Sequence, residues 1–124
     1  GTGYHLAQVL DAHPDSHGLA SDVSKPAIQR AAKAHRRMAA VVADTWAGLP
    51  IRTNCMDAVL CVFAPRNREE FVRIVKPDGI LVVVTPLQDR TLLVLDQMNA
   101  AEHAPRRTCR GGRQGEQFGI NPTA

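Results

Sequence analysis

Two aspartates, Asp22 and Asp44, each follow a short apolar segment that has the composition of a buried strand. In a nucleotide-binding α/β unit, an acidic side chain at the carboxyl end of the second strand accepts hydrogen bonds from ribose hydroxyls. Such a residue lies about 20 positions after a glycine-rich turn, and Gly1-Thr2-Gly3 lies at that spacing from Asp22. The sequence therefore predicts a nucleotide site centred on Asp22, with a plain helix-capping carboxylate as the alternative.

The glycine pattern separates two kinds of nucleotide ligand. Dinucleotide-binding folds need G-x-G-x-x-G/A, in which the third small residue lets a helix pack closely on a strand. Leu6 occupies that third position, so a nicotinamide-dependent oxidoreductase is the weaker hypothesis. A second carboxylate after the next strand, Asp44, fits S-adenosylmethionine instead, because that position lies beside the adenine amino group in enzymes that use this cofactor.

The spacing of apolar residues and breakers predicts alternating helices and strands. The predicted helices cover about residues 4–13, 24–35, 67–75 and 89–100, and the predicted strands cover 18–22, 39–43, 56–63 and 80–84. Ser24 and Asn67 are expected to cap two of the helices, and Pro77-Asp78-Gly79 is expected to end the third. The alternation implies an α/β fold with a parallel, doubly wound sheet.

Composition limits the class of protein. The 124 residues suit one domain, and 44% apolar with 22% charged residues is ordinary for a globular chain. The net charge is +3, but residues 1–98 carry 11 Lys and Arg against 10 Asp and Glu, which gives no strong electrostatic argument for nucleic-acid binding. From Asn99 onward the Arg- and Gly-rich sequence has little to bury, so we expect a folded part over residues 1–98 and a disordered basic tail over 99–124.

Metal and membrane functions are not predicted. The three cysteines form no C-x-x-C pair, and the histidines show no ligand spacing, so we expect no metal site. No apolar run approaches the roughly 18 residues of a membrane span. Together with the odd cysteine count and the lack of a charged-then-apolar leader, this predicts a cytoplasmic protein.

Six segments carry a specific resemblance. They are Gly1-Thr2-Gly3-Tyr4, Asp22-Val23-Ser24-Lys25-Pro26-Ala27, Ala43-Asp44 with Leu49-Pro50, Val62-Phe63-Ala64-Pro65-Arg66, Glu70-Phe71-Val72-Arg73, and Lys76 to Pro86 with the sequence KPDGILVVVTP. Together they resemble the S-adenosylmethionine-dependent large-subunit ribosomal RNA guanine-N1 methyltransferases, a group that includes the macrolide-resistance type. The resemblance runs from Gly1 to about Leu95 and implies a Rossmann-like class I methyltransferase fold.

The resemblance also implies roles for individual residues. Gly1 and Gly3 would let the backbone approach the methionine part of the cofactor, with Thr2 and Tyr4 beside them. Asp22 would bind the ribose hydroxyls, Val23 would touch adenine, and Asp44, next to Thr45, would accept from the adenine amino group. Phe63 would adjoin the cofactor, Ala64 and Pro65 the target guanine, and Arg66 an RNA phosphate. The implied reaction is attack of guanine N1 on the sulfonium methyl, and we assign no residue as its base.

The departures from the family pattern lead to further expectations. Members of the family begin with a zinc-binding domain and a first strand before the glycine loop, and they continue with further strands after the position of Pro86. We therefore expect an incomplete fold that lacks its first strand and its C-terminal strands. An apolar sheet edge left open in this way would favour self-association. A non-catalytic remnant of a methyltransferase is the alternative to an active enzyme that acts on ribosomal RNA.

Overall fold

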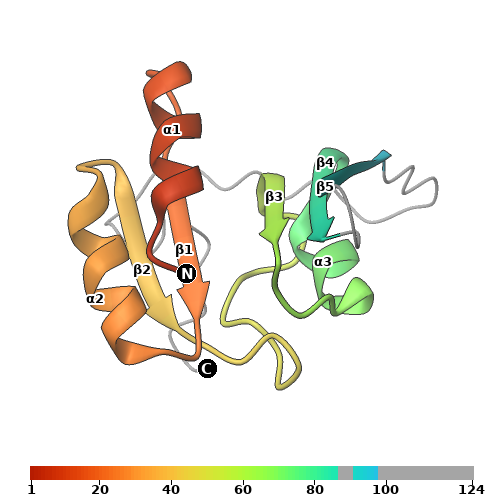
Figure 1. Ribbon diagram of the computed structural model, residues 1–124. Coiled ribbons are helices and arrows are strands. Elements are labelled where there is room, and N and C mark those ends of the chain that lie inside the picture. Colours follow the sequence, from red (N-terminus) through yellow and green to blue (C-terminus); the bar gives the residue numbers. More distant parts are fainter. Residues whose placement is uncertain (87–90, 98–124) are drawn as a thin grey trace. The chain divides into compact units, whose positions relative to one another are not determined.

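The computed structural model describes residues 1–86 and 91–97 (Figure 1). Its contacts divide the chain into two compact units, Gly1–Leu49 and Pro50–Ala124, each of which is described by itself. Within the described residues, no helix combines the length and the apolar character needed to cross a membrane.

The first unit alternates two helices with two parallel strands. Its elements are α1 (Tyr4–Ala12), β1 (Gly18–Asp22), α2 (Lys25–Ala34) and β2 (Met38–Val42), and these confirm the predicted order. The strands pair from Gly18↔Met38 to Asp22↔Val42. Leu10 of α1, Ala20 of β1, Ala31 of α2 and Met38 of β2 form one core cluster. Both helices therefore pack on the same face of the strand pair.

A glycine in β1 makes room for the bulky residue that departs from the dinucleotide pattern. Leu6 packs against the core from α1. A Cβ atom added to Gly18 would lie 2.9 Å from Leu6 Cδ2 and 3.1 Å from Leu10 Cδ1, so a side chain here would require these leucines to shift. The close contact between α1 and β1 thus depends on a small residue in the strand, Gly18, whereas the dinucleotide pattern places the small residue at the position of Leu6.

Arg37 fastens the end of α1 to the start of β2. Its guanidinium donates hydrogen bonds to the carbonyl oxygens of Leu10, His13 and Ser16, which include carbonyls that the end of a helix leaves without an intrahelical donor. Its own carbonyl accepts from Gly18 N at 2.9 Å. One residue in the turn before β2 therefore fixes the whole connection from α1 to β1.

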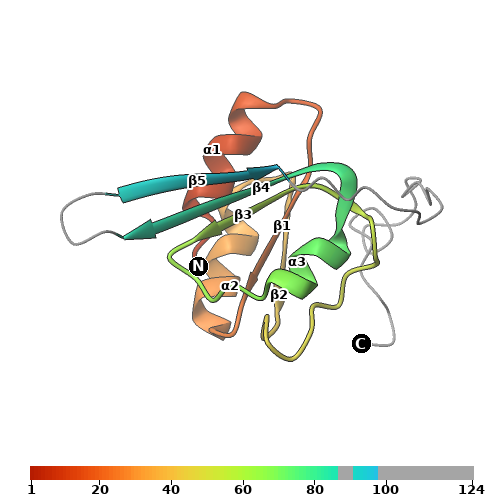
Figure 2. The same ribbon diagram turned by 90° about the vertical axis from the view of Figure 1, so that its right-hand side faces the viewer.

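The second unit contains β3 (Met56–Val62), α3 (Arg68–Ile74), β4 (Val75–Pro86) and β5 (Thr91–Gln97). Figure 2 shows the three strands side by side, in the order β3-β4-β5. The β3–β4 pair is parallel, as predicted, whereas β5 runs antiparallel to β4 from Ile80↔Gln97 to Pro86↔Thr91. The fold is α/β and consistent with an incomplete Rossmann-like methyltransferase domain.

The helix predicted over residues 89–100 is wrong where it can be compared, because Thr91–Gln97 is strand β5. The run Thr91-Leu92-Leu93-Val94-Leu95 is continuously apolar after its first residue, and a run of this kind suits a strand as well as a helix. Hydrogen bonding to the edge of β4 decides between the two. The remaining positions of that predicted helix, and the predicted tail over 99–124, lie outside the described residues.

Strand β4 begins earlier than the predicted strand over 80–84. It pairs with β3 first at Met56↔Val75 and then from Ala58↔Ile80, so the residues between form an irregularity in the strand. Pro77-Asp78-Gly79 falls in this irregularity, and α3 already ends at Ile74. A Cβ atom at Gly79 would lie 2.4 Å from Val75 Cγ1 and 3.0 Å from the carbonyl oxygen of Asp57, so only glycine fits this turn.

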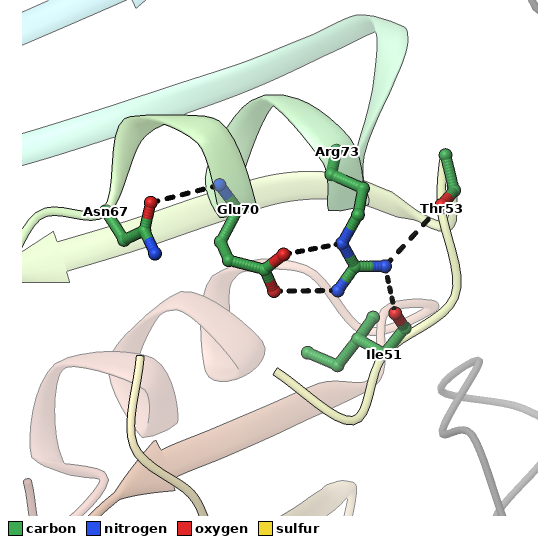
Figure 3. A network of polar contacts seen from close by, with 5 residues as sticks. All are labelled: Ile51, Thr53, Asn67, Glu70 and Arg73. Atoms are coloured by element: carbon green, nitrogen blue, oxygen red, sulfur yellow. Dashed lines mark hydrogen bonds and ion pairs between the residues drawn. The ribbon is translucent and has the colours of Figure 1, made fainter. Parts of the chain in front are cut away.

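A polar network joins α3 to the segment before β3 (Figure 3). Asn67 caps the helix, as predicted, by accepting from Glu70 N at 3.3 Å. The Glu70 carboxylate binds the Arg73 guanidinium in a bidentate pair, with distances of 2.7 and 2.8 Å. Arg73 also donates to the carbonyl oxygen of Ile51 at 2.6 Å. Glu70 and Arg73, the two ends of the Glu70-Phe71-Val72-Arg73 segment, thus have a structural role, because their ion pair holds the guanidinium that binds the segment before β3.

Among the described residues, β1 pairs only with β2, and β3 pairs only with β4. One edge of each of these strands is therefore without a described strand partner. Self-association through such an edge stays a prediction.

The contacts of Arg37 predict a large loss of stability when its side chain is removed. Arg37→Ala deletes three charge-assisted hydrogen bonds, and we expect the free energy of unfolding to fall by about 2–3 kcal/mol. Urea unfolding followed by circular dichroism measures this loss. The adjacent Arg36 is exposed, so Arg36→Ala is the matched control and should change the free energy by no more than about 0.5 kcal/mol. Equal effects of the two substitutions would contradict the assigned role.

Candidate cofactor site

The two predicted aspartates lie at one edge of the β1–β2 pair. Asp22 ends β1 and is the register partner of Val42, the last residue of β2. Ala43 N then donates to the Asp22 carbonyl oxygen at 3.1 Å, which keeps the chains paired one residue further. Asp44 follows directly. The carboxyl ends of parallel strands therefore bring both carboxylates to the same edge.

The Asp22 carboxylate is held by backbone groups on both sides. The terminal nitrogen of Gly1 donates to Oδ2, and Ser24 N donates to Oδ1 at 2.8 Å. The hydrogen bond from the Gly1 amino group and then that from Ser24 lower the pKa of the Asp22 carboxyl below its ordinary value of 3.8. The side chain is 28% exposed. It is thus a charged acceptor, fixed in direction and still accessible.

The glycine loop packs closely on α2. Gly3 has φ +80°, and an added Cβ would lie 2.8 Å from Met38 Sδ and 3.2 Å from Ala31 Cα, so both its conformation and its surroundings require glycine. Gly3 is also the N-cap of α1, and no side chain caps this helix. Its first N–H groups are thus without a side-chain cap beside the loop. The loop is formed in the structure, with Gly3 packed against Met38 and Ala31 and Gly1 in contact with the Asp22 carboxylate.

A tight turn follows β2 and presents an aromatic side chain. Asp44 Oδ1 accepts from Trp46 N at 2.9 Å, and the Asp44 carbonyl oxygen accepts from Ala47 N at 3.1 Å. The Trp46 side chain is 63% exposed, and that of Val23, after β1, is 67% exposed. Thr45 is half-buried within the turn. Trp46 was not predicted as a site residue, although its being the only tryptophan in a chain with 4% aromatic residues was a usable signal.

The predicted target-base residues lie directly after β3 in the second unit. Phe63 has φ +49°, a left-handed conformation that is a genuine outlier for a bulky residue. Phe63 N nevertheless donates to the Val84 carbonyl oxygen at 3.0 Å, and the side chain is 58% exposed. Ala64, Pro65 and Arg66 are exposed beside it. Backbone geometry of this kind has no signal in the sequence.

Cys61 supports this loop from inside the sheet. The residue is buried, and its Sγ atom lies 3.6 Å from the Ala64 carbonyl oxygen and 3.7 Å from that of Pro65. Burial raises the pKa of the Cys61 thiol, so the sulfur keeps the proton that it donates. Within residues 1–86 and 91–97, no group of three or more His, Cys, Asp or Glu side chains could hold a metal ion.

Comparison of the sequence with known families gives the class of protein. Residues 1–83 match the family model of a methyltransferase domain, and the chain belongs to that family. Relatives of the chain carry the name of the predicted subgroup. The chain is 48% identical over 110 residues to a putative 23S rRNA (guanine-N(1)-)-methyltransferase of Micromonospora griseorubida, covering 89% of this chain and 37% of that protein.

Two further relatives carry the same kind of name. One is a 23S rRNA (guanine(748)-N(1))-methyltransferase of Streptomyces fradiae, 50% identical over 98 residues, which cover 79% of this chain and 35% of the relative. The other is a putative 23S rRNA (guanine-N(1)-)-methyltransferase of Bacillus subtilis, 38% identical over 104 residues, which cover 84% of this chain and 36% of the relative. The chain spans a little over a third of the length of these relatives.

The lowered pKa of Asp22 predicts a pH dependence of stability. A carboxyl with a lower pKa in the folded chain stabilises the fold fully above its unfolded value, near 3.8, and loses this contribution as the pH falls through the folded pKa. We expect the melting temperature of the wild type to fall more steeply below about pH 4 than that of Asp22→Asn. Thermal melts from pH 7 to pH 2 measure the difference.

Asp15→Asn provides the matched control for this measurement. Asp15 is exposed in the loop before β1, and its substitution should leave the acid limb of the wild-type curve in place. Identical acid limbs for the wild type and Asp22→Asn would show that the hydrogen bonds of Asp22 do not stabilise the fold.

Proposed function

We propose that this chain provides the S-adenosylmethionine site of a methyltransferase that methylates guanine N1 in large-subunit ribosomal RNA. One observation carries the proposal: Asp22, whose carboxylate accepts from Ser24 N, lies at the same strand edge as Asp44, in a unit whose glycine loop leaves no room for a side chain at Gly3. A fixed carboxylate beside exposed apolar side chains suits a ligand with a ribose, an adenine and a positive charge. Because ribosomal RNA is the proposed substrate, a cytoplasmic location is part of the proposal.

The residues present fit the cofactor. Asp22 would accept hydrogen bonds from the two ribose hydroxyls, and the exposed Val23 would contact the adenine ring. Since Asp44 Oδ1 accepts from Trp46 N, its Oδ2 would accept from the adenine amino group, with Thr45 beside it.

The other end of the cofactor would lie on the glycine loop. Gly1, Thr2 and Gly3 leave room for the methionine part, and the N-terminal N–H groups of α1 from Tyr4 onward suit its carboxylate. When bound, the cofactor supplies an electrophilic methyl group on a sulfonium sulfur.

The loop after β3 would hold the target guanine. The left-handed conformation of Phe63 sets the direction of an exposed aromatic ring, and bases stack on such rings. Ala64 and Pro65 would line the position of the base, and Arg66 would contact a phosphate.

Binding of the product S-adenosylhomocysteine tests the cofactor site. We expect calorimetry and quenching of Trp46 fluorescence to report binding to the wild-type chain. Asp22→Asn removes a charged acceptor, so we expect affinity to fall about 10- to 100-fold. Asp15→Asn should bind as the wild type does. Tighter binding of NADH than of S-adenosylhomocysteine would reject the proposal and favour the nicotinamide-dependent oxidoreductase.

Primer extension on unmethylated 23S ribosomal RNA tests the reaction. After incubation with S-adenosylmethionine and the chain, we expect a new stop next to one guanine, since a methyl group at N1 blocks base pairing. Phe63→Ala should lower the methylation rate about 5- to 150-fold, the range for losing one stacked base.

The relative from Streptomyces fradiae serves as the positive control. A stop with that relative and none with this chain would identify the chain as a non-catalytic remnant.

A further inference from the structure

Positive and negative side chains are separated in the first unit. All its lysines and arginines lie between positions 25 and 37, and all its acidic residues lie outside that segment. The cations are Lys25, Arg30, Lys33, Arg36 and Arg37, and the acids are Asp11, Asp15, Asp22 and Asp44. The whole chain has 15 cations and 12 acids, so 10 cations and 12 acids lie outside the segment. Within the first unit, the positive charge is therefore concentrated on α2 and the turn after it.

Helix α2 carries its cations on the side away from the core. Ile28 and Ala31 are buried, whereas Lys25, Arg30 and Lys33 are exposed. At 100° per residue, Lys33 lies opposite the buried pair, with Lys25 and Arg30 on either side of it. The exposed face spans about 12 Å along the helix from Lys25 to Lys33.

Four of the five cations are available to a partner. Arg37 is used by the carbonyl groups at the end of α1. Lys25, Arg30, Lys33 and Arg36 make no ion pair with any residue in the part of the chain that the structure describes. We name these four residues the α2 basic face. Cations grouped without counter-charges attract a polyanion.

We propose that the α2 basic face binds the phosphate backbone of the RNA substrate, an inference that rests on the proposed function. Its exposed side offers Gln29 and Ala32 between the cations and no large apolar side chain, so it lacks the anchors of a membrane-bound helix. Asp22 and Asp44 at the strand edge repel phosphate and attract a cationic cofactor. The charge separation thus directs the two ligands to different surfaces of one unit.

Filter binding of in vitro transcribed 23S ribosomal RNA to the whole chain tests this inference. The variants Arg30→Gln and Lys33→Gln remove one charge each and keep good helix formers in α2. The matched control is Arg52→Gln, which removes one exposed charge from the second unit. For each α2 variant we expect the slope of log K against log salt to decrease by about 1 and the affinity near 0.1 M salt to fall about five- to tenfold. Arg52→Gln should retain the wild-type slope.

Two further measurements decide between the outcomes. The α2 variants should keep the wild-type affinity for S-adenosylhomocysteine, which separates this inference from the cofactor site. Equal losses with Arg52→Gln would show an effect of net charge alone and would overturn the proposal. Tighter binding of polyglutamate than of RNA would assign the face to an acidic protein and overturn it as well. If the wild-type chain binds S-adenosylhomocysteine but no RNA, the α2 proposal fails while the cofactor site stands.

Discussion

The carboxylate of Asp22 joins the parts of the first unit on which the site depends. It ends β1, accepts from Ser24 N at the start of α2, and accepts from Gly1 at the start of the loop that leads into α1. The end of a strand, the start of α2 and the glycine loop thus share one charged acceptor. Because the acceptor is fixed by backbone groups, its direction does not depend on flexible side chains. A ligand that binds there meets an arrangement formed in advance.

Local signals explain how much of the fold could be predicted from the sequence. The helix caps Ser24 and Asn67 act on backbone N–H groups within three residues, so short segments are sufficient to identify them. Parallel strands that end in Asp22 and Asp44 follow from the alternation of strands and helices. Asp22 and Asp44, among the predicted cofactor residues, and the predicted target residues after β3 lie at or just after strand ends for the same reason.

Long-range contacts explain what could not be predicted. Strand β5 was predicted as a helix because the choice depends on pairing with β4, not on its own composition. Arg37 and Arg73 bind carbonyl groups more than 20 positions away, and no spacing rule points to such partners. Phe63, with its left-handed backbone, likewise makes a long-range contact, the hydrogen bond from its N–H group to the Val84 carbonyl oxygen in the neighbouring strand.

The net charge of the chain does not reveal how its charged residues are distributed. Summed over residues 1–98, cations and acids nearly cancel, although α2 holds cations alone. Helical geometry then separates three roles on one element: Ser24 caps its start beside Asp22, Ala31 packs against the core and under Gly3, and Lys33 faces solvent. Substitutions on the outer face leave the other two roles intact, because residues on opposite sides of a helix share no contacts. The two binding functions proposed for this unit, of a cation at the strand edge and of a polyanion on the helix, can therefore be altered independently.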